Sequence, residues 1–454
     1  MGSGTLVVKL AHVCRRWRTL ILASTSHLGL CLVCTYNTPV EDMLAHSPPL
    51  PLVMDYADGS RVLTEEHAQG MRIALQYRDR ILCIRFSAHE THLRHFIAAF
   101  IEKELPILEY LLIKLPETHS SPLGLRLPNT FQTPHLRHLA LTRLTFPTVS
   151  PLLTTTVGIV TLSLKFVIHC HPNNLLERLA LLPRLETLKI SLPAYLPLLE
   201  MHELRTPPFT HVTLPNLRWF WFKGISDYLE ILLLGMATPL LEKLQITFFC
   251  QLNFSVPCLQ QYMSKIGNLN FCSAKLAFND KEVAVSIYPH EGARTSVFSV
   301  HVLWPLLGWK PSSLDEIFDI LSPLFFAVVD LTLDYSEHIL PPEPNDDTCR
   351  ALWRKFLMSF NNVKTLRIHE DLVGDLSRSL RPDREPPLEI LPELQVLICP
   401  AGSDDGDAFT AFIHARKVAG HLVRLVHVVA PDSPPASTGK SRLVRENHLA
   451  RLWF

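Results

Sequence analysis

The chain contains 454 residues, of which 47% are hydrophobic and 19% charged, so it can bury an extensive core and does not have the composition of a disordered, collagenous or coiled-coil protein. Its 43 basic residues balance its 43 acidic ones, and no global field directs it towards nucleic acid or acidic membranes. Its 35 prolines outnumber its 17 glycines, which predicts short, punctuated elements and disfavours a helical bundle or a glycine-dependent nucleotide fold.

The first predicted element is an amphipathic helix near the amino terminus. Its apolar face would consist of Leu10, Val13, Cys14, Trp17 and Ile21, which recur at helical spacing. Three arginines lie opposite, and we interpret them as a solvated face because no aromatic interleaving or basic stripe accompanies them. The following residues 19–34 alternate like a strand and match neither a signal peptide nor a membrane span. We therefore expect a cytoplasmic or nuclear protein.

A short frame recurs along the rest of the chain: an apolar residue, two variable ones, an apolar residue, one variable residue and a last apolar residue. The frames begin at Leu108, Leu136, Ile159, Leu185, Leu217, Leu241, Val328, Val363 and Leu394. Apart from the gap between Leu241 and Val328, successive frames lie from 23 residues (136 to 159) to 35 residues (328 to 363) apart, and helix-capable segments separate them. This pattern predicts an α/β fold, an irregular leucine-rich-repeat-like solenoid with parallel strands on its concave face and helices outside.

The frame is absent between Leu241 and Val328. Three alternating runs in this gap, 274–278, 283–287 and 297–303, predict a hairpin or antiparallel insertion near residues 250–310. The expected organisation is a short helical segment in residues 1–26, the solenoid in 27–430 and a tail in 431–454. The tail is predicted to be flexible because its first part is rich in proline and serine.

The amino-terminal segment resembles part of a known motif. Val13-Cys-Arg-Arg-Trp17-Arg, followed by an apolar pair and a serine-bounded turn, is similar to the closing half of an F-box. It resembles the F-box proteins of mushroom-forming fungi, in which this motif leads into leucine-rich repeats. No Leu-Pro-rich opening of the motif is present in residues 1–6, so we expect a partial F-box that contains only its last helix.

The resemblance implies binding to the Skp adaptor and, through it, to a cullin in a Skp–cullin–F-box ubiquitin ligase. Val13, Cys14 and Trp17 are the positions that match, and they are the candidate adaptor contacts. The alternative for Trp17 is packing in the core. A second alternative is a truncated or degenerate F-box without ligase coupling, which leaves a plain interaction scaffold.

The candidate client-binding residues lie in the frame Leu217-Arg-Trp-Phe-Trp-Phe. If its three apolar anchors point inwards, Trp219 and Trp221 lie on the exposed side, where tryptophans are frequent hot spots. The alternative is that both pack under loops. Basic residues occupy variable positions of several frames and would make the concave face locally basic: Arg137, Lys189, Arg218, Lys243, Lys364 and Arg367. This favours an acidic or phosphorylated protein partner.

No catalytic, cofactor or metal site is predicted. The histidines at 89, 92 and 95 lack zinc-protease spacing, and the run His169-Cys-His171 would alternate faces if it formed a strand, so its side chains could not all converge on one ion. The aspartates at 404, 405 and 407 do not match a calcium loop. The single CxxC, Cys31 to Cys34, has no second pair, so we expect it to be structural. These absences are consistent with a binding protein. Together with them, the resemblance implies a protein-binding substrate receptor and not an enzyme, with an enzyme of an unrecognised class as the remaining alternative.

Overall fold

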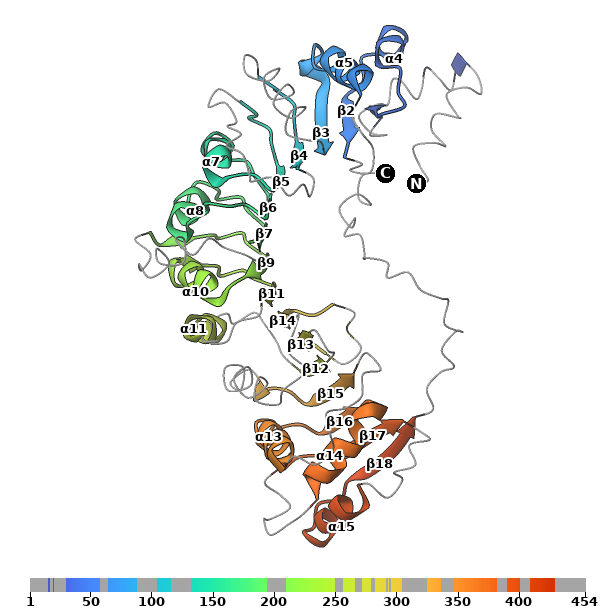
Figure 1. The fold of residues 1–454 in the computed structure, drawn as a ribbon, viewed down its shortest axis with the longest axis vertical. Coiled ribbons are helices and arrows are strands. Elements are labelled where there is room, and N and C mark those ends of the chain that lie inside the picture. The colour runs from blue at the N-terminus through green and yellow to red at the C-terminus, as the bar shows by residue number, and fades with distance from the viewer. Residues whose placement is uncertain are drawn as a thin grey trace. The chain divides into compact units, whose positions relative to one another are not determined.

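The computed structural model shows an α/β protein with a large, mostly parallel β-sheet and helices (Figure 1). It describes residues 15–16, 19, 30–57, 64–87, 104–115, 132–193, 210–249, 256–265, 272–278, 282–290, 293, 295–303, 325–335, 347–381, 390–400 and 409–428. The described residues divide into two compact units, one that ends at Ile159 and one that begins at Val160. The candidate adaptor contacts Val13, Cys14 and Trp17 lie outside the described residues, as do residues 431–454.

The first unit is a parallel sheet with helices in its connections. Its strands pair in chain order: β1 (Leu32–Cys34), β2 (Leu52–Tyr56), β3 (Ile81–Ser87), β4 (Tyr110–Lys114) and β5 (His138–Thr142). The helical elements are α4 (Val40–His46), α5 (Glu65–Ala74), the 3-10 turn η1 (Arg78–Arg80) and α7 (Phe146–Thr155). Helix α5 begins with a capping box, in which the side chains of Thr64 and His67 accept hydrogen bonds from each other's backbone N–H groups.

The second unit contains the longer part of the sheet. Its sheet order is β6 (Thr161–Lys165), β7 (Thr187–Ser191), β9 (Trp219–Gly224), β11 (Lys243–Phe248), β14 (Phe298–Leu303), β13 (Glu282–Tyr288), β12 (Ser273–Phe278), β15 (Asp330–Tyr335), β16 (Thr365–Ile368), β17 (Val396–Pro400) and β18 (Arg424–Val428). Its helices are α8 (Pro172–Leu179), α10 (Ser226–Gly235), α11 (Pro257–Lys265), α13 (Asp347–Met358), α14 (Val373–Leu380) and α15 (Thr410–Val418). The 3-10 turn η2 (Glu370–Leu372) precedes α14, and β8 (Val212–Thr213) pairs separately with β10 (Met236–Ala237).

Each frame found in the sequence coincides with a strand that starts two residues after the first apolar anchor. In β9, for example, Leu217 precedes the strand, and Phe220, Phe222 and Gly224 are its buried residues. The intervening residues Trp219 and Trp221 are only partly buried. The apolar anchors therefore face the core, as the period of two predicts for a half-buried strand.

The middle of the second unit departs from parallel pairing. Strand β13 pairs antiparallel with both β12 and β14, whereas β14 pairs parallel with β11 and β12 pairs parallel with β15. These three strands contain the alternating runs from which the sequence predicted a hairpin or antiparallel insertion. The sheet is thus continuous from β11 to β15, and only β13 runs antiparallel to its two neighbours.

Helices α8, α10 and α11 pack side by side on one side of β7, β9 and β11 (Figure 1). Tyr228 of α10 stacks on Phe222 with ring centroids 6.1 Å apart, and its hydroxyl donates a hydrogen bond to Cys170 Sγ (3.4 Å). Only a glycine fits at position 224 without displacing the Phe222 ring, because a Cβ at this position would lie 2.7 Å from Phe222 Cζ. The helices therefore cover the face that carries Phe220 and Phe222. No described helix is long and apolar enough to cross a membrane.

Helix α11 receives its amino-terminal cap from a neighbouring helix. Val256 precedes the helix and offers no side-chain acceptor, and Glu230 of α10 accepts the backbone N–H groups of Cys258 (2.6 Å) and Leu259 (2.9 Å) in its place. Burial raises the pKa of Glu230, and the two N–H donors oppose that shift. The cap of α11 is therefore supplied by a residue of α10 and not by a residue that directly precedes α11 in the sequence.

The variant Glu230→Ala is expected to lower the free energy of unfolding by about 1–2 kcal/mol, because two N–H groups at the start of α11 lose their acceptor. Urea unfolding followed by circular dichroism measures this effect. Glu177→Ala, on the exposed side of α8, is the matched control and is expected to change the value by less than about 0.5 kcal/mol. Equal effects of the two substitutions would contradict the capping role.

Candidate protein-interaction site

The candidate site lies on the face of the sheet opposite α8, α10 and α11. We call it the outward face. In β9, Trp219, Trp221 and Lys223 point to this face and are partly exposed, whereas the alternate residues are buried. The two tryptophans are therefore on the side of the strand opposite its apolar anchors, while the buried phenylalanines hold the strand against α10.

The strand register places lysines beside both tryptophans. Trp219 is aligned with Lys243 of β11, and Trp221 is aligned with Lys189 of β7. No aspartate or glutamate occupies the outward positions of β6, β7, β9 and β11. These positions are Thr161, Ser163, Lys165, Thr187, Lys189, Ser191, Trp219, Trp221, Lys223, Lys243, Gln245 and Thr247. This part of a chain with no formal net charge is therefore locally basic.

The lysine ammonium groups lie over the indole rings. Lys189 Nζ is 4.1 Å and Lys243 Nζ 4.9 Å from the centroid of the Trp219 ring, and Lys165 Nζ is 5.8 Å from that of Trp221. These distances are within the range of cation–π attraction. We call Lys165, Lys189, Trp219, Trp221, Lys223 and Lys243 the lysine–tryptophan patch.

Hydrogen bonding and desolvation further define the patch. Trp219 Nε1 donates a hydrogen bond to Gln245 Oε1 (3.1 Å), which orients the indole on the sheet. Partial burial lowers the pKa of Lys243. A partly desolvated ammonium group loses less water on binding an anion than a fully hydrated one does.

The structure separates the predicted client-binding residues into two groups. Trp219, Trp221 and Lys243 lie together in the patch, whereas Arg218 is exposed at the start of β9 and forms an ion pair with Glu242. Two patch residues, Lys165 and Lys223, escaped the sequence prediction. Both directly follow the last apolar anchor of their frame. Extending each strand by one residue, with alternate side chains on opposite faces, would have placed them on the outward face.

A pocket opens further along the sheet, beside β12, β15 and β16. It has a volume of about 390 Å³ and is lined mainly by polar residues of β12, β15 and β16, including Lys275, Asp330, Thr332 and Arg367. Lys275 Nζ lies 2.5 Å from Asp334 Oδ2, so this cation of the pocket already has an anionic neighbour. Acidic and basic groups are mixed in this pocket, in contrast to the lysine–tryptophan patch.

One described cluster has the donor atoms of a metal site. Ligand atoms of His369, Glu370 and Asp371 lie within 4.8 Å of one another, but both carboxylates belong to exposed residues. His369 Nδ1 lies 3.3 Å from Asp371 Oδ2, which is a local ion-pair geometry around η2. An exposed acidic cluster of this kind occurs commonly without a metal.

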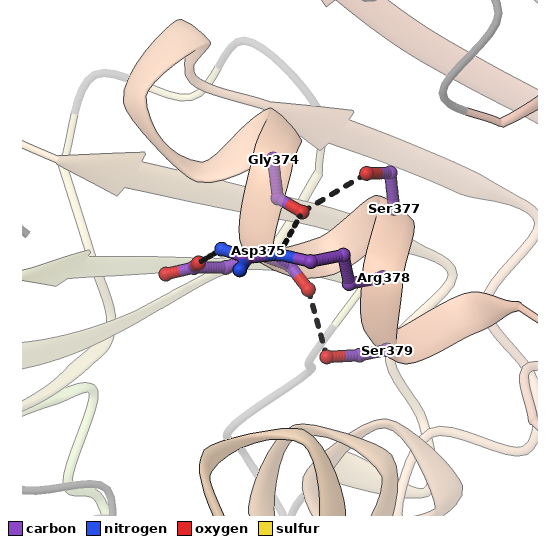
Figure 2. Close-up of polar contacts among 5 residues, drawn as sticks. All are labelled: Gly374, Asp375, Ser377, Arg378 and Ser379. Carbon is purple, nitrogen blue, oxygen red and sulfur yellow. Dashed lines mark hydrogen bonds and ion pairs between the residues drawn. The ribbon is translucent and has the colours of Figure 1, made fainter. Parts of the chain in front are cut away.

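Helix α14 adjoins this cluster, and the polar contacts drawn in Figure 2 lie within the helix, whereas its Ser379 carbonyl also accepts a hydrogen bond from Arg354 of α13 (3.3 Å). Ser377 Oγ and Arg378 Nε donate to the carbonyl of Gly374 at 2.9 and 3.2 Å. Arg378 also pairs with Asp375, whose carbonyl accepts from Ser379 Oγ (2.8 Å). These side chains satisfy acceptors and charges of their own helix, so their arrangement is structural.

The other chemistry-bearing residues weighed in the sequence also have structural surroundings where they are described. His171 caps α8 by accepting the N–H of Asn173 (3.3 Å). Burial raises the pKa of Cys34 to about 11 and that of Cys83 to about 12, which keeps these thiols protonated and weakly reactive. The histidines at 89, 92 and 95 and the aspartates at 404, 405 and 407 lie outside the described residues.

The patch combines aromatic rings and long cationic side chains on strands that are paired on both sides. A scan of protein-family models and a search of curated proteins gave no match to this chain. The assignment of a function therefore depends on the site itself.

Proposed function

We propose that this chain is a protein-binding substrate receptor that recognises a client through the lysine–tryptophan patch, as the F-box subunit of a Skp–cullin–F-box ubiquitin ligase. Ubiquitin transfer would take place on other subunits, and the chain itself would be no enzyme. The observation that carries the receptor part is the pair Trp219 and Trp221, held on the outward face among lysines. Tryptophan near the centre of an interface is a frequent source of binding energy.

The order of the patch supports its use in binding. Trp219 has both a hydrogen bond to Gln245 and two ammonium groups over its ring, and its strand is paired on both sides. Side chains that are already ordered lose less conformational entropy when a partner binds. We propose the leucine-rich-repeat-like solenoid as the scaffold of this surface, because every frame of the sequence coincides with a strand.

The link to a ligase is supported by the sequence of residues 13–18 alone. Its resemblance to the closing part of an F-box proposes Val13, Cys14 and Trp17 as contacts to the Skp adaptor. An amphipathic helix with one apolar face needs a partner surface, and an adaptor would supply one. The client-binding and adaptor-binding residues would then belong to different parts of the chain.

Co-purification of the chain with its host's Skp adaptor tests this link. We expect stoichiometric binding that is lost in a variant lacking residues 1–24, and retained in the variant Trp219→Ala. Failure of the intact chain to bind the adaptor would contradict ligase coupling. The alternative proposal would then remain, namely an interaction scaffold with a degenerate or truncated F-box.

A further inference from the structure

We infer that the lysine–tryptophan patch binds a carboxylate-rich segment of a client protein, in which several aspartate or glutamate side chains contact the lysines. This inference rests on the proposed function as a protein receptor and names the chemistry that the receptor recognises. It is drawn from the composition of the outward face, the contacts of the indole rings and the spacing of the cations.

The first argument is charge complementarity. The outward positions of β6, β7, β9 and β11 carry four lysines and no acidic residue, although the whole chain has equal numbers of both. Glu242 lies near this surface but forms an ion pair with Arg218 at the start of the strands. A partner with negative charge therefore gains attraction along four adjacent strands and meets no like charge at their outward positions.

The second argument concerns the indole rings. Two ammonium groups already lie within 5 Å of the centroid of Trp219, at 4.1 and 4.9 Å. A nucleobase that stacked on this ring would have to displace a lysine, so the geometry does not favour a single-stranded nucleic acid. A carboxylate, in contrast, can contact an ammonium group from the solvent side while the cation–π contact remains.

The third argument is the spacing of the cations. Lys189 and Lys243 lie on strands separated by one other strand, β9, and so do Lys165 and Lys223, separated by β7. With neighbouring strands about 4.8 Å apart, the backbones of each pair are about 10 Å apart. An extended peptide advances about 3.3 Å per residue, so an acidic stretch of three to four residues spans each pair.

Fluorescence anisotropy with the full chain tests the inference. The probe is a fluorescein-labelled peptide of twelve residues that alternates aspartate and serine, and its neutral counterpart has asparagine in place of aspartate. We expect the aspartate peptide to bind at least about tenfold more tightly at 0.1 M salt, and the difference to shrink at 1 M salt, where screening acts over about 3 Å.

The double variant Lys189→Gln/Lys243→Gln is expected to weaken binding of the aspartate peptide by about tenfold or more. The matched control is Lys114→Gln/Lys417→Gln, which removes two exposed lysines elsewhere and is expected to change affinity less than about twofold. Both variants should retain the unfolding midpoint of the parent chain, which separates loss of binding from loss of fold.

Three results would overturn the inference: equal binding of the aspartate and asparagine peptides, equal losses in the two double variants, or tighter patch-dependent binding of a twelve-nucleotide oligouridine. Tighter binding of a phosphoserine–serine peptide than of the aspartate peptide would also overturn the choice of carboxylate. The adaptor co-purification does not depend on these lysines. If that experiment succeeds and the peptide fails, the receptor proposal stands and only the client chemistry is wrong.

Discussion

Replacing Arg416 with alanine is expected to lower the free energy of unfolding of the second unit by about 3–5 kcal/mol. Arg416 lies on α15 and is completely buried, with 0% of its surface exposed. Its guanidinium donates hydrogen bonds to the carbonyls of Ile390 (3.1 Å), Leu391 (3.0 Å) and Pro392 (2.6 Å), in the turn that leads into β17. Removal of the side chain leaves a cavity and three carbonyls without this donor.

The turn itself makes this dependence stronger. Leu391 has a backbone φ of 51°, in the left-handed region that costs a branched residue energy, so the turn needs contacts that hold it. Burial lowers the pKa of Arg416, but a guanidinium keeps its charge. Its Cζ lies 5.6 Å from the centroid of the Phe412 ring. The charge is thus held by carbonyl dipoles and an aromatic ring.

Urea unfolding monitored by circular dichroism provides the measurement, with a two-transition fit because the chain has two compact units. Lys417→Ala changes the next residue on the exposed side of α15 and is expected to cost less than about 0.5 kcal/mol. Arg416→Lys retains the charge but not the planar fork, so we expect an intermediate loss. A loss below about 1 kcal/mol for Arg416→Ala would show that the turn does not need this side chain.

The second large effect is expected from Phe222→Ala, with a loss of about 3–5 kcal/mol in the free energy of unfolding. Phe222 has 0% of its surface exposed, and its ring centroid lies 6.5 Å from that of Phe220 and 6.1 Å from that of Tyr228. The absence of a side chain at Gly224 makes room for this ring, and removal of the ring leaves a cavity in the core. The strand that carries the patch would lose its attachment to α10.

The adjacent residue provides the control on the same strand. Trp221→Ala removes a larger side chain from the outward face and is expected to cost only about 1 kcal/mol, because that side chain is partly exposed. It is also expected to weaken binding of the aspartate peptide, since Lys165 loses the ring beneath its ammonium group. Equal destabilisation by both substitutions would mean that Trp221 belongs to the core and not to a binding surface.

The sequence alone predicted the α/β class and the strands that coincide with the nine frames and the three alternating runs, but not β2, β3 or β18. Leucine, isoleucine and phenylalanine anchors at a period of two assign one face of each strand to the core, and this is a local property that the chain carries without its neighbours. The same reasoning identified the alternating runs that become β12, β13 and β14. For Trp219 and Trp221 it left two alternatives, the exposed side of the strand or packing under loops. The division into two compact units at Ile159 was not predicted.

The tertiary structure decided which side chains meet. Lys165 and Trp221 are 56 residues apart in the sequence (165 to 221). In the sheet only β7 separates their strands, β6 and β9, so the two side chains meet. Glu230 likewise caps a helix 28 residues further along the chain, and Arg416 holds a turn 24 to 26 residues before it. Periodicity determines the face on which a residue lies, because it depends on neighbouring backbone angles. The partner across strands or helices depends on register and packing, which involve segments that no local pattern connects.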